Sequence, residues 1–414
     1  MKKDTSATPF TSYQKFVIIS LALTLFTVVL DFMVMSPLGD MLMKSMSLTT
    51  SQFGLAVSAY AISAGISGML TAGFADRFDR KKLLLFFYTG FIIGTVFCGL
   101  AYNYWLLIAA RIFTGIFGGV IGSISMAIIT DLFDIHHRGR VMGFIQMGFG
   151  ASQVLGIPFS LYLANLWDWQ APFMFVAILG AIIALVILSK MQPVTKHLAM
   201  QQQRSAVAHL WHTLAKRHYR MGFLTTCLLS LGGFMMMPFG SAFAINNLGL
   251  TNEQLPLLFM FSGISTLLIM PVIGRVSDKV DKFKLFTGAS LWMIVMAIIY
   301  THLSTTPFWV VVTLNILMMM GVMSRMVPSG ALVSAIPDMA DRGAFMSINS
   351  SLQQIAGGLA AAVAGMIVVQ KDKTSPLQHY DTVGYIIGGL TIVSIYMLYR
   401  VNVLAKSKMK EEKL

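Results

Sequence analysis

Long apolar runs separated by short polar loops dominate the pattern of the chain. A helix needs roughly 20 consecutive apolar residues to span a bilayer. Twelve runs meet this requirement, and the pattern therefore predicts an all-α membrane protein with twelve transmembrane helices. The runs cover residues 15–41, 52–73, 83–101, 105–130, 141–163, 171–190, 221–245, 254–275, 284–301, 307–334, 344–369 and 382–402.

The longest polar stretch, residues 191–220, divides these segments six and six. We expect an N-terminal six-helix bundle over residues 1–190, a linker over 191–220 and a C-terminal six-helix bundle over 221–414. Parallel repeats of helices with a substrate site between them are one standard transporter plan. The predicted architecture is thus two bundles related by pseudo-two-fold symmetry.

Composition and charge agree with a membrane protein. Of the 414 residues, 56% are hydrophobic and 11% are charged, whereas soluble proteins carry about 25% charged residues. The net charge of +13 comes from loops between apolar runs, which indicates membrane topology rather than nucleic-acid binding. Cys98 and Cys227 lie within apolar runs and are expected to be inert small hydrophobic residues. The first run is too long for a signal peptide and is assigned as the first span.

The distribution of basic residues predicts the orientation. Three of the 30 Lys and Arg residues, Lys44, Lys371 and Lys373, lie in loops on one side, and two, Arg111 and Arg325, lie within spans. The remaining basic residues lie in the termini and in the loops on the N-terminal side. The positive-inside rule then places both termini and the linker in the cytoplasm, with the protein in a bacterial inner membrane.

The two halves repeat a charged loop. Residues 72–82 read AGFADRFDRKK and residues 274–284 read GRVSDKVDKFK. Asp76 corresponds to Asp278, and Arg77 corresponds to Lys279. A second repeat relates RGRVMGF at 138–144 to RGAFMSI at 342–348.

These loops resemble the signature of the major facilitator superfamily, Gly-x-Leu-Ala-Asp-Arg-x-Gly-Arg-Lys. Ala72 and Asp79 replace two of its glycines, while the charged core is intact. The resemblance covers the whole chain and implies the major facilitator fold. It also implies a cytoplasmic gate in which Asp76 and Asp278 each bridge to the opposite half. A solvated turn that only fixes topology is the alternative. The gate residues implied are Asp76, Arg77, Arg80, Arg140, Asp278, Lys279 and Arg342.

Three features are similar to the drug:proton antiporter branch of this superfamily. An acid, Asp31, precedes a proline, Pro37, in the first run. Residues 111–119 read RIFTGIFGG, and residues 148–158 read GFGASQVLGIP, a partial match to the glycine- and proline-rich motif of antiporters. The resemblance implies proton-coupled export.

Asp31 is the one acid, among 17, that we place well inside a span. A charge at the bilayer centre costs at least ~2.5–3.5 kcal/mol and marks a functional pathway or an ion pair. Arg111 lies at a similar depth, to within roughly 6 Å at 1.5 Å per helical residue. We predict that Asp31 carries the proton and that Arg111 is the fixed charge that tunes it. A structural ion pair that only locks the two helices together is the alternative, and it stays open.

A substrate cavity between the halves is expected to hold polar, Met and aromatic side chains, which suit a small amphiphilic molecule. Arg325 lies in the inner half of its span with no acid left to pair with it, so it contacts an anionic substrate group or is satisfied by carbonyls and water. Ordinary helix packing is the alternative for the whole set. The candidate cavity residues are Thr27, Gln146, Gln153, Met236, Arg325, Asn349 and Gln353.

The predicted function is proton-coupled export of small amphiphilic or drug-like molecules by alternating access. Uptake of a small metabolite by proton symport and a non-transporting membrane sensor are the alternatives. No phosphate-binding Gly-x-x-x-x-Gly-Lys-Ser/Thr loop and no clustered nucleophile or acid–base set occurs, so we predict neither an ATP-driven pump nor an enzyme. No cofactor, metal or nucleic acid is expected. The predicted partners are a small-molecule substrate, protons and the lipid bilayer, with the protein as a monomer.

Overall fold

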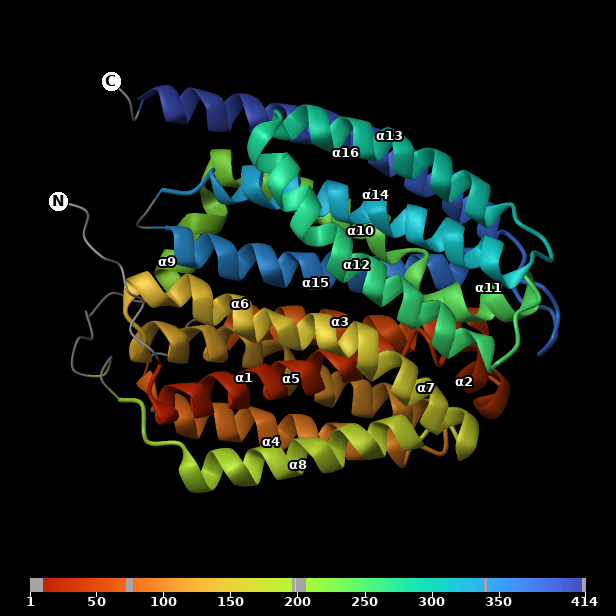
Figure 1. The fold of residues 1–414 in the computed structure, drawn as a ribbon, viewed down its shortest axis with the longest axis horizontal. Coiled ribbons are helices and arrows are strands. Elements are labelled where there is room, and N and C mark those ends of the chain that lie inside the picture. The colour runs from red at the N-terminus through yellow and green to blue at the C-terminus, as the bar shows by residue number, and fades with distance from the viewer. Residues whose placement is uncertain (1–9, 72–76, 196–197, 199–205, 339–340, 412–414) are drawn as a thin grey trace.

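The computed structural model describes residues 10–71, 77–195, 198, 206–338 and 341–411. Twelve helical segments in it are long and apolar enough to cross a membrane, by length and composition. They run side by side along the long axis of the molecule, and both termini lie at the same end (Figure 1). The prediction of an all-helical protein with twelve spans is confirmed.

Each half supplies six spans. The N-terminal spans are α1 (Ser12–Val34), α3 (Thr50–Thr71), α4 (Arg80–Gly99), α5 (Tyr104–Leu132), the continuous segment α6 (Ile135–Ala151), η2 (Ser152–Gly156) and α7 (Ile157–Leu166), and α8 (Ala171–Lys190). The C-terminal spans are α10 (Arg217–Phe234) with η4 (Met237–Phe239) and α11 (Gly240–Asn246), then α12 (Gln254–Lys279), α13 (Lys282–Thr301), α14 (Phe308–Ser334), α15 (Arg342–Ile367) and α16 (Tyr380–Glu411). Two shorter helices are α2 (Gly39–Met46), after α1, and α9 (Ala206–Ala215), in the linker.

Three of the predicted spans are not regular helices throughout, and a proline lies at each irregularity. Pro37 lies in the turn between α1 and α2, and Pro238 lies in the 3-10 turn between α10 and α11. Pro158 follows the π-helical turn η2. A proline has no backbone N–H to donate within a helix, and its ring crowds the preceding turn. π-turns are often found at functional sites.

The two halves meet along seams formed by small residues. On α3, a Cβ atom at Gly54 would lie 2.7 Å from the carbonyl oxygen of Ala361 on α15. At the second seam, a Cβ atom at Gly263 on α12 would lie 3.0 Å from the carbonyl oxygen of Gln153 in η2. Small residues let membrane helices approach this closely. The π-turn of the fifth span therefore lies directly against the opposite half.

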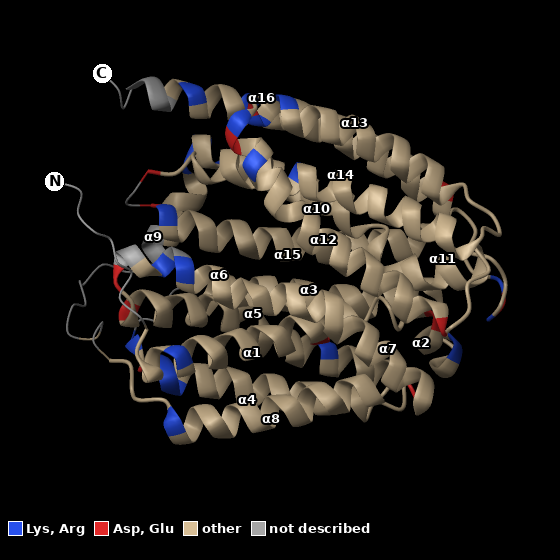
Figure 2. Ribbon diagram, viewed as in Figure 1, with Lys and Arg blue, Asp and Glu red and all other residues tan. Residues whose placement is uncertain are grey.

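The charged side chains gather at one end of the molecule. Figure 2 shows Lys and Arg concentrated at the end that carries both termini, with few at the opposite end. We call these the charged end and the loop end. The loop end is formed by the connections at residues 35–50, 100–103, 167–170, 247–253, 302–307 and 368–379.

Candidate functional site

Asp31 and Arg111 form a buried ion pair inside the N-terminal half. Nη1 of Arg111, on α5, donates to Oδ2 of Asp31, on α1, over 2.9 Å, and neither side chain is exposed. The other carboxylate oxygen, Oδ1, accepts a hydrogen bond of 3.1 Å from Oγ1 of Thr95 on α4. The structure therefore brings together the two residues that depth alone predicted to be neighbours.

Close helix packing positions the arginine. The guanidinium carbon of Arg111 lies 4.5 Å from the ring centroid of Tyr60 on α3, an arrangement that favours a cation. One helical turn further along α5, a Cβ atom at Gly115 would lie 2.5 Å from the carbonyl oxygen of Tyr60. Only glycine at this position allows α3 to approach near enough for Tyr60 to cover the guanidinium.

Part of the arginine's hydrogen-bonding capacity is unused. Nε and Nη2 of Arg111 are buried and have no hydrogen-bond partner among the residues that the structure describes. Unpaired polar atoms are rare in protein interiors and call for an explanation. In this conformation the pair is surrounded by α1, α3, α4 and α5, and neither side chain has any exposed surface.

Sequence reasoning missed Thr95 and Tyr60. Both are among the buried residues of their spans. A single threonine or tyrosine in an apolar run is too common to stand out, because Thr and Tyr often hydrogen-bond within or between neighbouring helices. These two residues can be identified only from the packing of α3 and α4 against α5, which brings them to the ion pair.

Two predicted cavity residues face the inside of a bundle. Thr27 is fully buried, and its hydroxyl lies 2.8 Å from the hydroxyl of Tyr88 on α4. In this conformation its side chain lies among helices of the N-terminal half, and its place in a substrate cavity stays a prediction. Asn349 accepts a hydrogen bond of 2.7 Å from Thr226, so it joins α15 to α10 within the C-terminal half.

Other predicted cavity residues lie at or near the boundary. Gln153 belongs to the π-turn that packs on α12, and its amide nitrogen lies 4.0 Å from Sδ of Met33 on α1. Met236 is buried beside the α10–η4 junction, where its carbonyl accepts a hydrogen bond from Tyr380. Gln146 is exposed on α6, and Gln353 is half-buried on α15.

Arg325 is also buried within its span, and its environment differs from that of Arg111. Its side chain is 7% exposed, its guanidinium carbon lies 5.6 Å from the ring centroid of Phe286 on α13, and its Nε has no partner among the described residues. The aromatic ring gives the cation partial compensation. Arg325 thus packs against α13, the neighbouring helix of its own half, and its contact with an anionic substrate group stays a prediction.

The predicted gate residues are spread over the charged end. Asp76 lies outside the described residues. Arg77, Arg140, Asp278, Lys279 and Arg342 are exposed, and the structure describes no ion pair between any two of them.

Two charged clusters at this end were not predicted. Arg80 is buried and donates to Asp131 at the end of α5 over 3.4 Å, a contact within the N-terminal half. Lys216 donates a hydrogen bond to Asp341, and this bond raises the pKa of Lys216 above its ordinary value. Both clusters tie helices of the same half together.

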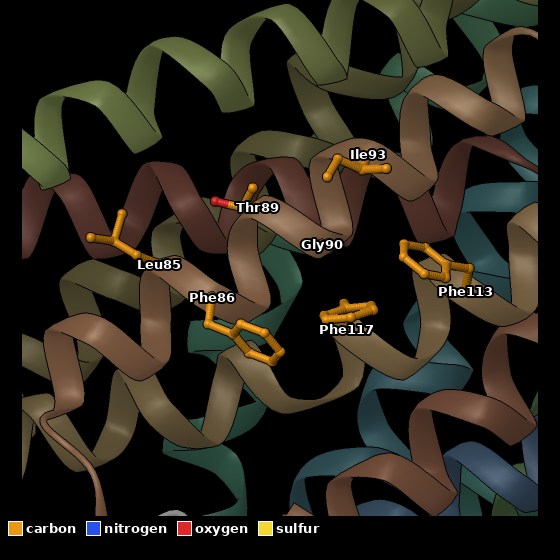
Figure 3. A pocket seen from close by; sticks show the side chains of 7 residues that line it. All are labelled: Leu85, Phe86, Thr89, Gly90, Ile93, Phe113 and Phe117. Atoms are coloured by element: carbon orange, nitrogen blue, oxygen red, sulfur yellow. The ribbon is translucent and has the colours of Figure 1, made fainter.

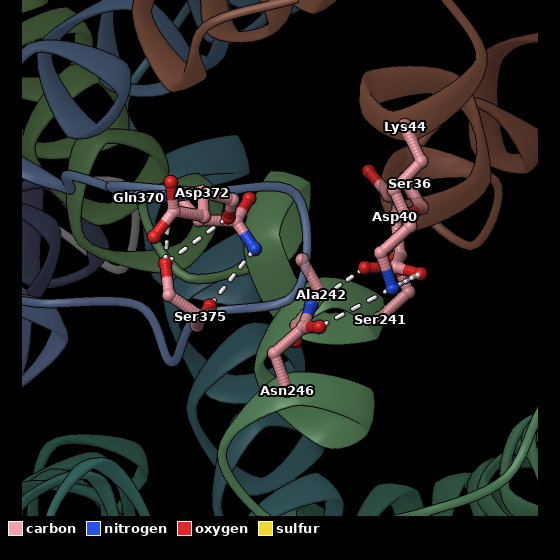
Figure 4. A network of polar contacts seen from close by, with 9 residues as sticks. All are labelled: Ser36, Asp40, Lys44, Ser241, Ala242, Asn246, Gln370, Asp372 and Ser375. Atoms are coloured by element: carbon pink, nitrogen blue, oxygen red, sulfur yellow. Dashed lines mark hydrogen bonds and ion pairs between the residues drawn. The ribbon is translucent and has the colours of Figure 1, made fainter. Parts of the chain in front are cut away.

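The loop end carries polar bonds that cross between the halves (Figure 4). Nδ2 of Asn246, on α11, donates to Oδ1 of Asp40, on α2, over 2.6 Å. Lys44 donates to Oδ2 of the same carboxylate over 2.7 Å and to Oδ1 of Asn246 over 3.2 Å. Ser241 donates to the carbonyl of Ser36 over 2.8 Å. We call Asp40, Lys44 and Asn246, with the Ser36–Ser241 bond, the loop-end latch.

A pocket of about 430 Å³ opens on the surface between α4 and α5 (Figure 3). The ring of Phe117 lies over Gly90, where a Cβ atom would be only 2.2 Å from the ring. The lining is apolar apart from Thr89 and carries no charged group. Nothing in it can orient a substrate, so it is not the functional site.

Residues 21–361 and 223–413 match the family model of the Major Facilitator Superfamily. The chain belongs to this superfamily. YceJ, an uncharacterized MFS-type transporter of Bacillus subtilis (strain 168), is 24% identical over 354 residues, which are 83% of this chain and 87% of YceJ. A "Probable sugar efflux transporter" of Helicobacter pylori (strain G27) is 25% identical over 187 residues, which are 44% of this chain and 47% of that protein.

Solved superfamily structures have the same fold. The crystal structure of a D-xylose-proton symporter superposes with a TM-score of 0.76 at 19% identity, over 93% of this chain and 97% of that chain. A bacterial homolog of the human lysosomal transporter Spinster, in its inward-facing and occupied conformation, gives a TM-score of 0.70 at 15% identity, over 97% of this chain and 98% of that chain. As a member of this superfamily with twelve candidate spans, the protein is a multi-pass membrane transporter and not an enzyme.

Proposed function

We propose that this superfamily member is a proton-coupled exporter of small amphiphilic or drug-like molecules, of the drug:proton antiporter kind, with Asp31 as its proton carrier. The observation that carries the proposal is the fully buried carboxylate of Asp31, paired with one permanent cation and no other described charge. Charged residues inside a membrane are energetically costly, and they usually mark an ion, proton or substrate pathway. We also propose that the charged end faces the cytoplasm, on the positive-inside rule.

The chemistry of the pair links proton binding to movement. A proton on Asp31 would remove the anion that compensates Arg111 and leave a buried cation whose Nε and Nη2 already lack partners. Removing one partner of a buried ion pair costs about 3–5 kcal/mol. The arrangement seen here, with both side chains buried, is therefore stable when Asp31 is ionised. Protonation of Asp31 favours a different arrangement in which water hydrates Arg111.

The α1–α2 junction connects this pair to the boundary between the halves. Asp31 lies in the last turn of α1, and the chain then passes Ser36 and enters α2, which carries Asp40. Ser36 and Asp40 are both bonded to α11 of the opposite half. Opening the loop end must break these bonds and release the end of α1. Because the same helix carries Asp31, separation of the halves at the loop end shifts the backbone that holds the proton site.

Two kinds of evidence support export over uptake. The first is a resemblance to antiporters in three motifs: Asp31 before Pro37, the arginine-containing helix at 111–119, and the partial motif at 148–158. The π-turn within the last motif lies on the seam between the halves. The Helicobacter relatives are named as sugar efflux transporters, which supports export but widens the substrates to be tried.

Proteoliposomes with an imposed pH gradient test the proposal. Ethidium, chloramphenicol and xylose are offered in turn, with solute and proton movements recorded for the wild type and for Asp31→Asn. We expect at least one solute to move against the direction of the proton, and Asp31→Asn to move neither. Solute and proton moving together would establish uptake instead. Movement of neither across the panel, with binding retained, would indicate a sensor.

A further inference from the structure

We propose that the groove between α9, α10 and α15 at the charged end is a binding site for an anionic phospholipid of the bilayer. The groove has a volume of about 390 Å³. This inference goes beyond the transport function and does not depend on it. The lining residues that carry it are Trp211, Leu214, Arg220, Leu224, Cys227 and Leu352.

The groove opens outward rather than into the C-terminal half. On α10, Leu224 is 54% exposed, whereas Gly222, on the opposite side of the helix, is covered by Ile336 and Phe345. Trp211, on α9, is 69% exposed at the mouth of the groove. An exposed apolar surface within a membrane span lies against lipid.

The depth of the groove fits a phospholipid lying at the membrane surface. Span 7 begins at Arg217, and Leu224 and Cys227 lie about 10 and 15 Å further along at 1.5 Å per residue. Those two residues and Leu352 suit an acyl chain. Trp211 and Arg220 lie nearer the surface, where tryptophan and arginine are enriched at membrane interfaces.

Charge selects the headgroup. The lining residues include Arg220 and no acid. Arg220 is exposed and makes no ion pair with a described residue. Lys216 is different, because Asp341 neutralises it. Basic pockets between helices on the cytoplasmic side of membranes bind anionic headgroups, at about 1 kcal/mol per basic residue. The pocket of Figure 3 lacks any charge and has no such preference.

Quenching of Trp211 fluorescence by brominated lipids tests the site. The protein is placed in nanodiscs of phosphatidylcholine with a minor fraction of phosphatidylglycerol, and bromine is carried on the chains of one lipid or the other. The signal of Trp211 is obtained as the difference from Trp211→Phe. We expect brominated phosphatidylglycerol to be enriched at Trp211 about fivefold over phosphatidylcholine at equal mole fraction. Nanodiscs present both lipids to both faces, so the result does not depend on orientation.

Three variants test whether Arg220 selects the anionic lipid. Arg220→Gln should remove the enrichment, and Arg220→Lys should keep it. Arg400→Gln alters another exposed arginine, on α16, and should change nothing. Equal quenching by the two lipids in the wild type would overturn the proposal, because the groove would then hold bulk lipid. No quenching by either lipid, together with a dimer in native mass spectra, would also overturn it, because a second copy would cover the groove.

Discussion

Two acids of this transporter, Asp31 and Asp40, each contact a cation, but of the two only Asp40 also makes a contact that crosses the boundary between the halves. Asp31 and its partners Arg111 and Thr95 all belong to the N-terminal half. Asp40 is bonded to Lys44 of its own half and to Asn246 of the other. If the halves rotate as rigid bodies and the loop end opens, the contact between Asp31 and Arg111 is kept and the contact between Asp40 and Asn246 is broken.

In the proposed mechanism, location rather than residue type separates the proton carrier Asp31 from the latch residue Asp40. A carboxylate at the boundary loses its partner and gains water whenever the loop end opens. A carboxylate inside one bundle changes partners only if its own helix shifts. The α1–α2 turn joins the two sites, so the latch can control the pair although no side chain of one touches the other.

The largest effect is expected from Asp31→Asn. Proton-driven transport should be abolished, while expression and ligand binding remain measurable. The asparagine leaves Arg111 buried without its anion, which costs about 3–5 kcal/mol of stability. Transport is measured in proteoliposomes, and the free energy of unfolding is measured in parallel.

The double variant Asp31→Asn/Arg111→Gln serves as its control. It removes the orphaned cation and should regain much of the lost stability while still failing to couple protons. Recovery of active transport in the double variant would favour the structural ion pair over the proton carrier.

Asn246→Ala should weaken the latch. It removes the bonds to Asp40 and Lys44, and an unsatisfied buried partner costs about 1–3 kcal/mol, so the population open at the loop end should rise roughly fivefold or more. A reporter cysteine at buried Ala242 would be labelled faster by a maleimide added at the loop end.

Asn247→Ala is the matched control for the latch. Asn247 is bonded to Leu377 within the C-terminal half, so its loss should not speed labelling. Equal acceleration by both variants would mean that the loop end is loosened generally and that the latch has no special part.

Asp76→Ala tests the gate that the repeated loops predict at the charged end. Folding should stay near normal, because the sequence predicts a charged loop between two spans at residues 72–82, and transport cycling should slow. Asp278→Ala makes the same test in the second half, where the acid is exposed in this structure. Normal turnover and normal melting temperatures in both variants would contradict the gate and show that these loops only fix the membrane topology.

The smallest effect is expected from Asp281→Asn. The hydrogen bond that Lys406 donates over 2.9 Å lowers the pKa of Asp281. A lowered folded-state pKa stabilises the protein above the unfolded pKa, and this contribution is lost as the pH falls through the folded value. The pair is partly exposed, so the variant should lose ~0.2–1 kcal/mol at neutral pH and nothing in acid. A loss that persists at low pH would show that packing rather than charge holds this contact.

The sequence was sufficient to predict features that depend on composition and periodicity. The twelve spans and the neighbouring depths of Asp31 and Arg111 follow from counting residues along apolar helices. The π-turn at Ser152–Gly156, the turn at Pro37 and the contacts of Thr95 and Tyr60 were not predicted. They depend on how helices pack against one another, which a single sequence does not specify. The contact between Thr27 and Tyr88 was not predicted either, because a helical stripe shows which residues share a face and not which neighbour that face meets.

Infrared difference spectroscopy on the protein in lipid tests the protonation of Asp31 most directly, since it needs no substrate. The buffer is shifted from alkaline to mildly acidic, and the carbonyl stretch of a neutral carboxyl group is followed. We expect this band to grow in the wild type and to be missing in Asp31→Asn, with helix content unchanged. A band of equal size in Asp31→Asn, or no band in the wild type, would contradict a proton carried by this residue.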